Sequence, residues 1–169
     1  MNQTVETSKL RIRWSKSDDL ALPVTAKLLC DMWRGLGARE LYCSVPGLPV
    51  TQNHMYIKHT HVLVPEIGQY RDLVAYVLGY RKSEWKPRGA VAGVFVFEAP
   101  LWVTKANEIK NADADNRVKC GLDALAKATQ MPDQQVWEVH AYKLVSKRTR
   151  TRMWLYDLGD VVDGCLLTE

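Results

Sequence analysis

The chain has 169 residues, enough for one domain with a sizeable core and few for two. Hydrophobic residues make up 47% and charged residues 25%, as in ordinary globular proteins, and no apolar run approaches the roughly 20 residues that span a bilayer. The net charge of +4 is modest, so charge alone does not define a class. The four cysteines are widely spaced, with no Cys-x-x-Cys pair, which argues against a zinc ribbon or a disulfide framework. The start of the chain lacks the apolar segment of a secretory signal, so we expect a cytoplasmic protein with no membrane partner.

The first half of the chain predicts two helices and two strands. Residues 18–38 have helical spacing, and we expect their apolar side chains to pack on the main body. Residues 40–57 predict a short strand interrupted by prolines and glycine, and residues 68–80 predict a second amphipathic helix. Residues 89–103 are rich in β-branched and aromatic residues, which indicates a well-buried strand. The apolar residues of the first helix are Leu28, Leu29, Met32, Trp33 and Leu36.

The second half predicts one helix followed by two strands. Residues 116–128 carry apolar side chains at i, i+4 and i+7, with Asn116 as a potential cap. Residues 135–145 and 147–158 both alternate like strands, and the short link near Ser146 predicts a hairpin between them. Helices and strands mix without a regular βαβα order, so the pattern favours an α+β fold, a sheet with helices on one side.

Basic residues are concentrated in two segments. Residues 143–152, KLVSKRTRTR, contain no acid, and residues 81–89, RKSEWKPRG, surround one tryptophan with positive charge. Such concentrations favour a polyanionic partner such as DNA, because neutralising phosphates releases counterions. A solvated strand face and a solvated turn are the alternatives. The candidate DNA-binding residues are Lys143, Lys147, Arg148, Arg150, Arg152, Lys86 and Arg88.

An acidic motif precedes the helix of the second half. In extended backbone Asp113 and Asp115 point the same way, and two neighbouring carboxylates repel unless a cation lies between them. Hard oxygen ligands suit magnesium or manganese rather than zinc. Lys119 lies about one turn into the helix, where a cation can meet a phosphate oxygen, and Asp133 can return to the same side after the helix. Three acids and a lysine suit metal-assisted hydrolysis of a phosphodiester.

A simpler interpretation of the same residues stays open. Asp and Asn before a helix are common caps, and Lys119 and Asp123 have the spacing of a surface ion pair. Asp133 has the position of a turn residue. Short acidic motifs also match by chance.

The motif resembles the RusA family of Holliday-junction resolvases. The resemblance rests on Asp-x-Asp-Asn-x-x-Lys at 113–119, LDAL at 122–125 and DQQV at 133–136, in that order. Upstream, VPGLPVTQNHMY at 45–56 resembles the family's early strand, and YRDLVAYVL at 70–78 the helix after it. The family usually has an acid where this chain has Pro132, and basic residues where it has Asn111 and Ala112.

The resemblance implies an activity, a site and an organisation. It implies a magnesium-dependent endonuclease, with Mn²⁺ as a substitute, that resolves Holliday junctions and other branched DNA by paired nicks from a homodimer. Asp113, Asp115 and Asp133 would bind the metal, and Lys119 would act in cleavage. Residues 41–158 would form a RusA-like nuclease domain with a small mixed sheet, preceded by an N-terminal extension (1–40) with an extra helix and followed by an acidic tail (159–169). A phage or bacterial source fits this family, and a non-catalytic branched-DNA-binding protein on the same scaffold is the alternative function.

Overall fold

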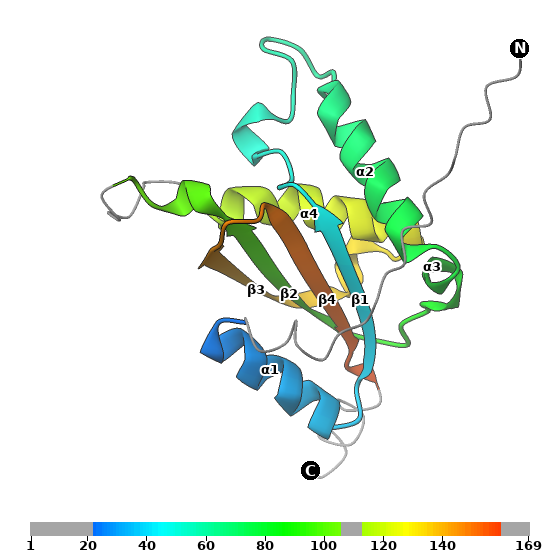
Figure 1. The fold of residues 1–169 in the computed structure, drawn as a ribbon. Helices are drawn as coiled ribbons and strands as arrows, with labels where there is room; N and C mark the ends of the chain where they lie inside the picture. The colour runs from blue at the N-terminus through cyan, green and yellow to red at the C-terminus, as the bar shows by residue number, and fades with distance from the viewer. Residues whose placement is uncertain (1–21, 106–112, 160–169) are drawn as a thin grey trace, which may run out of the picture.

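A four-stranded mixed sheet lies at the centre of the molecule (Figure 1). The structure is a computed structural model that describes residues 22–105 and 113–159. The strand order is β1-β4-β2-β3. β4 pairs antiparallel with both β1 and β2, whereas β3 runs parallel to β2 at one edge. The strands are β1 (Arg39–Pro46), β2 (Val91–Ala99), β3 (Val136–Val145) and β4 (Arg150–Asp157).

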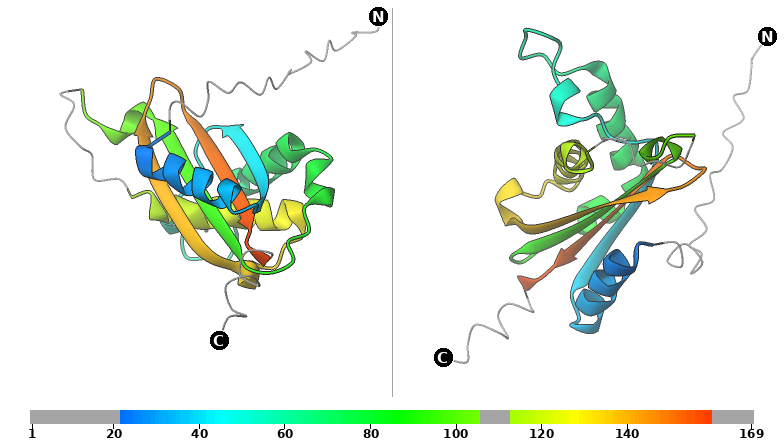
Figure 2. Two further views of the ribbon diagram at one scale, coloured as in Figure 1. Left: turned by 90° about the horizontal axis from the view of Figure 1, so that it is seen from below. Right: turned by 90° about the vertical axis from the view of Figure 1, so that its left-hand side faces the viewer.

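The helices cover both faces of this sheet (Figure 2). α2 (Pro65–Leu78) and α4 (Asp115–Thr129) lie on one face, and α1 (Val24–Gly35) lies on the other. The short α3 (Arg81–Glu84) follows α2, and single turns form η2 (Gln52–His54), η3 (Pro100–Trp102) and η4 (Asp133–Gln135). The α+β class is confirmed, with α1 as a third layer. No helix in these described ranges is long and apolar enough to cross a membrane.

β2 provides side chains for the packing of helices on both faces of the sheet. All nine of its residues are buried, including Glu98, and its otherwise apolar composition predicts this burial. Phe95 and Phe97 face α2 and α4, whereas Val94 and Val96 face α1. Alternation of side chains along one strand therefore supplies two separate hydrophobic clusters.

The predicted hairpin between the last two strands is wrong. β3 and β4 follow each other in the chain, but β2 lies between them and pairs with both. The short link therefore passes the end of β2, where the backbone N–H of Ser146 donates to the carbonyl of Ala99. β2 is the more apolar partner for both strands, and placing it in the centre buries it on both sides.

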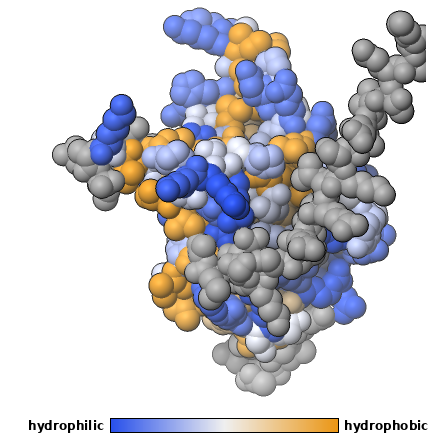
Figure 3. Space-filling model, in the orientation of Figure 1, coloured by the Kyte–Doolittle hydropathy of each residue, from blue (hydrophilic) through white to orange (hydrophobic). Residues whose placement is uncertain are grey.

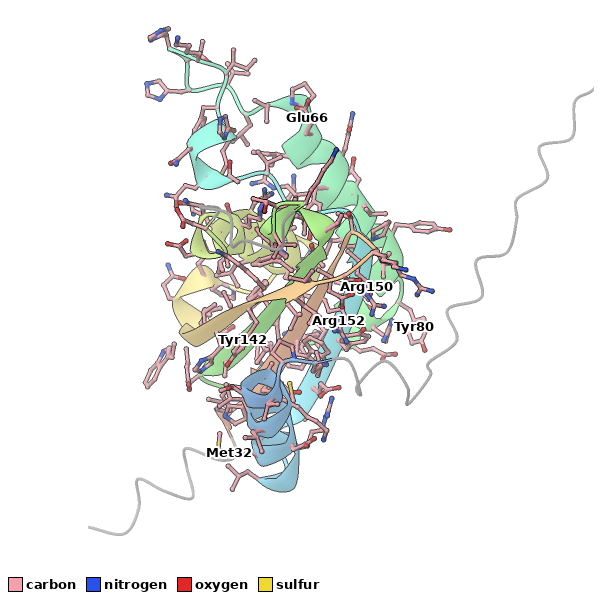
Figure 4. All side chains as sticks on the ribbon, turned by 60° about the vertical axis from the view of Figure 1, so that its left-hand side comes forward. Met32, Glu66, Tyr80, Tyr142, Arg150 and Arg152 are labelled. Atoms are coloured by element: carbon pink, nitrogen blue, oxygen red, sulfur yellow. The ribbon has the colours of Figure 1, made fainter. Side chains whose placement is uncertain are left out.

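The predicted packing face of α1 is also largely wrong. Leu28, Met32 and Leu36 remain 63%, 48% and 56% exposed. The buried residues are instead Ala26, Cys30 and Trp33, which recur at i, i+4 and i+7. The small side chains of Ala26 and Cys30 bring the helix close to the sheet, and Trp33 packs on Tyr156 with ring centroids 5.1 Å apart. A small apolar patch is visible at the lower left of Figure 3, near the start of α1, and Met32 projects outward in Figure 4.

Candidate active site

The acidic motif lies at the start of α4. The helix begins at Asp115, with Ala114 at the N-cap position. Asn116 is therefore the second residue of the helix rather than its cap, and its side chain donates a hydrogen bond to Asp113 over 3.3 Å. Asp115 lies in the first turn, where the helix dipole favours a carboxylate.

A groove between α4 and β3 brings three of the four predicted catalytic residues together. It has a volume of about 540 Å³. Asp115 and Lys119 line it from α4, and Asp133 lines it from η4. Asp123 of α4 also lines it, and the other four lining residues are apolar. The complete lining of this α4–β3 groove is Asp115, Val118, Lys119, Leu122, Asp123, Asp133, Val139 and Ala141.

A second hollow adjoins the groove on the side of α2. Lys119, Asp123 and Asp133 line both hollows, so they form the ridge between them. Lys119 Nζ lies 3.4 Å from Asp123 Oδ1, and Arg71 Nη2 from α2 lies 3.9 Å from Asp123 Oδ2. The sequence predicts Asp123 only as a surface partner of Lys119 and indicates no role for Arg71. The sequence features that could have indicated a role for Asp123 are its i,i+4 spacing from Lys119 and its position inside the LDAL motif.

Asp113 differs from the other predicted metal ligands in its position. It is exposed and is not part of the lining of the groove. Within residues 22–105 and 113–159, no three acidic, histidine or cysteine side chains are arranged to hold one metal ion. The carboxylates of Asp115 and Asp133 nevertheless provide the hard oxygen donors that Mg²⁺ prefers, along one groove.

Two of the predicted DNA-binding arginines are tied to a buried acid. Arg152 is fully buried, and its guanidinium pairs with Glu98, which is only 2% exposed. Arg150 Nε donates to the same carboxylate over 2.7 Å. Both arginines alternate with Thr151 and Met153 as predicted, but they lie on the α1 side of the sheet (Figure 4). The expected contact of Arg152 with DNA stays a prediction, and its burial beside Glu98 does not favour it.

Lys143 lies on the face of the sheet that carries the groove. Val139 and Ala141 line the groove, and Lys143 follows them on the same face of β3. Its Nζ lies 5.5 Å from the ring centroid of Trp102. Arg117 of α4 contacts the same ring at 5.8 Å and donates to the carbonyl of Pro49 over 2.5 Å. Partial burial lowers the pKa of Arg117 from its ordinary value.

The remaining basic candidates lie at opposite ends of the sheet. Lys86 and Arg88 are exposed in the segment before β2. Gln135 of η4 donates to the carbonyl of Pro87 over 3.4 Å, so this segment adjoins the turn that carries Asp133. Lys147 and Arg148 are exposed in the link after β3, at the far end.

Carboxylates and a lysine along one groove of an α+β scaffold are typical of enzymes that hydrolyse phosphodiesters. The family model of endodeoxyribonuclease RusA matches residues 46–155, about two thirds of the chain. The chain therefore belongs to the RusA family of Holliday-junction resolving endodeoxyribonucleases, and it is a nuclease. No curated protein sequence matches the chain. The matched segment includes α2, β2, α4, β3 and most of β4, whereas α1 and all of β1 except Pro46 lie outside it.

Proposed function

We propose that this protein is a magnesium-dependent, structure-selective endonuclease that resolves four-way DNA junctions by paired nicks from a homodimer. The observation that carries the proposal is the shared groove of Asp115, Lys119 and Asp133. Membership of the RusA family supports branched DNA as the substrate.

Asp113, Asp115 and Asp133 would hold the metal. Their carboxylates suit Mg²⁺, with Mn²⁺ as a substitute, because both cations prefer oxygen ligands. A bound Mg²⁺ supplies an activated water and charge stabilisation at the scissile phosphate.

Basic side chains of the protein would bind phosphates of the DNA backbone and so fix its position at the groove. Lys119, on the groove rim, would meet a phosphate oxygen as negative charge develops there. Lys143 would contact a neighbouring phosphate from the same face, and Lys86 and Arg88 would do so beside η4. Lys147 and Arg148 would extend the contact at the far end of the sheet.

A homodimer would supply the second nick. A four-way junction has symmetry-related strands, and two copies of one groove related by a two-fold axis can reach both. Two nicks from two equivalent sites leave products that can be ligated.

Replacement of Asp115 tests the proposal. Asp115→Asn should reduce nicking of a synthetic four-way junction by at least about a hundredfold, because it removes charge from the metal site. Junction binding should stay equal or become tighter, since the basic surface is unchanged. The measurement is nicking and gel-shift binding with and without Mg²⁺, with Asp31→Asn on α1 as an exposed control. Equal cutting by Asp115→Asn and the parent in Mg²⁺ would contradict the site, and a parent that binds without cutting in Mg²⁺ or Mn²⁺ would contradict the proposed nuclease.

A further inference from the structure

Asp123 lines both hollows and lies between an exposed cation, Lys119, and a mostly enclosed one, Arg71. Its side chain is 18% exposed, compared with 51% for Lys119 and 20% for Arg71. The lysine one turn before it therefore reaches into solvent, whereas the arginine that approaches it from α2 is mostly enclosed.

Arg71 pairs with this carboxylate from a second helix. α2 packs against α4 through Tyr70, Val74 and Leu78, so the guanidinium is carried by a helix of the core. Its Nε is buried without a hydrogen-bond partner among the described residues, and its Nη2 faces Asp123 Oδ2 at 3.9 Å. Asp123 is thus held from a second helix, unlike an acid in an ordinary exposed i,i+4 pair.

The held carboxylate in turn limits the motion of Lys119. A lysine side chain has a flexible four-carbon stem and samples many rotamers. An exposed acidic partner that is equally flexible restricts these rotamers little. A partner with one fixed position keeps the ammonium at the rim of the groove that Asp115 and Asp133 also line. Ordering before the DNA arrives removes part of the entropic cost of aligning the cation with a phosphate.

The charges of this triad leave Lys119 able to act. Two cations, Arg71 and Lys119, surround one anion, so the triad has a net charge of +1. Asp123 is therefore shared, and it does not cancel the positive charge that the groove presents to a phosphate. Its loss would leave two cations without the acid that separates them.

We infer that Asp123, held by Arg71, is a positioning residue that orients Lys119 toward the scissile phosphate. The inference rests on the proposed function of the groove. Asp123 acts through Lys119 and does not itself touch the substrate.

A double-mutant cycle tests the inference. Asp123→Asn should slow single-turnover nicking of a four-way junction by about tenfold or more while its Kd stays within about threefold of the parent, because only alignment is lost. Asp123→Glu should recover part of the rate. In a Lys119→Ala background, Asp123→Asn should cost nothing further. An unchanged rate in Asp123→Asn, or an equal loss in both backgrounds, would overturn the inference.

A chemical readout does not depend on cutting. An ammonium held against a carboxylate is acylated more slowly than one that rotates in water, so Asp123→Asn should raise the acylation rate of Lys119 and leave that of Lys127 unchanged. Asp31→Asn is the matched control, since it breaks the Lys27–Asp31 pair, also i,i+4, at 2.6 Å. Unchanged labelling of Lys119 in Asp123→Asn would overturn the inference even if the parent cut no junction, and an inactive parent with increased labelling would overturn only the proposed function.

Discussion

Arg152 shows how far a residue's role depends on its partner across the sheet. Alternation along 147–158 correctly places Arg150 and Arg152 on one side of a strand. It does not show that Glu98, on the neighbouring strand, lies between them and draws both guanidinium groups inward. The alternating sequence pattern is the same for a buried arginine and for an exposed one. Only the pairing of β2 with β4 shows which of the two Arg152 is.

Arg152→Ala should lower the free energy of unfolding by about 3 kcal/mol, because removal of one partner leaves a buried charge poorly compensated. Urea denaturation gives the value, and Arg148→Ala, at an exposed position of the adjoining link, should change stability by no more than about 0.5 kcal/mol. Arg152→Ala should also leave the salt dependence of junction binding unaltered. A stable variant with weaker binding would show instead that Arg152 meets DNA.

The candidate site was predicted more completely than the basic surface. Asp115, Lys119 and Asp133 line the same groove, because a helix followed by a short turn returns the chain to the same face of the sheet. Pro132, which stands where the family usually has an acid, begins the turn that carries Asp133, with a φ of −66° that suits the proline ring. Asp123 was recognised only as a surface partner because Arg71 is distant in sequence and arrives through the packing of α2 on α4.

Among the elements, α1 departs most from its predicted packing. Its apolar residues cover a wide arc, and the sequence alone favours the larger ones as the buried side. The sheet selects instead the side with Ala26 and Cys30, since small residues allow the close approach that buries Trp33 against Tyr156. The side of α1 that packs on the sheet is therefore determined by the size of its side chains, and not by hydrophobicity alone.

Two substitutions distinguish the faces of α1. Trp33→Ala should destabilise the protein by about 3–5 kcal/mol, because it leaves a large cavity between helix and sheet. Leu28→Ala, on the exposed side, should cost no more than about 0.5 kcal/mol. Both values come from chemical denaturation with unchanged helix content as a check. The reverse order would mean that Leu28 faces the sheet.

The predicted hairpin failed for a reason that applies to other sheets. Two alternating segments joined by a short link usually pair with each other, and local sequence favours that solution. Here each of them pairs with β2, which lies far earlier in the chain. The identities and approximate limits of α2, β2, α4, β3 and β4 were predictable because each depends on periodicity within one segment, whereas the order of strands depends on contacts between segments.

At the scale of the whole molecule, the two faces of the sheet carry different groups of charged residues. The face of α2 and α4 carries the groove and Lys143, and the face of α1 carries the buried Arg152 and Glu98 with the partly buried Arg150. The DNA surface that we propose therefore lies on the first face and at the ends of the sheet. The uneven charge of the sequence indicated a polyanionic partner without showing this division.

The salt dependence of junction binding should show which face of the sheet contacts DNA. Lys143→Ala should reduce the slope of log Kd against log salt by about one unit, because one phosphate contact is lost. Lys27→Ala removes an equal charge from α1, on the opposite face, and should leave the slope unchanged. Equal effects of the two substitutions would place the DNA elsewhere.

The groove depends on one long connection between two strands. Asp115, Lys119, Asp123 and Asp133 all lie between β2 and β3, which pair in parallel and therefore cannot close through a tight turn. The antiparallel pairs of β4 join segments still further apart in the chain, since Arg39 pairs with Asp157 and Glu98 with Arg150. Contacts between such distant segments form slowly, because the intervening loop must lose its entropy first. We therefore expect the groove to form only as the whole sheet assembles, so that a folding chain gains catalytic competence together with its core.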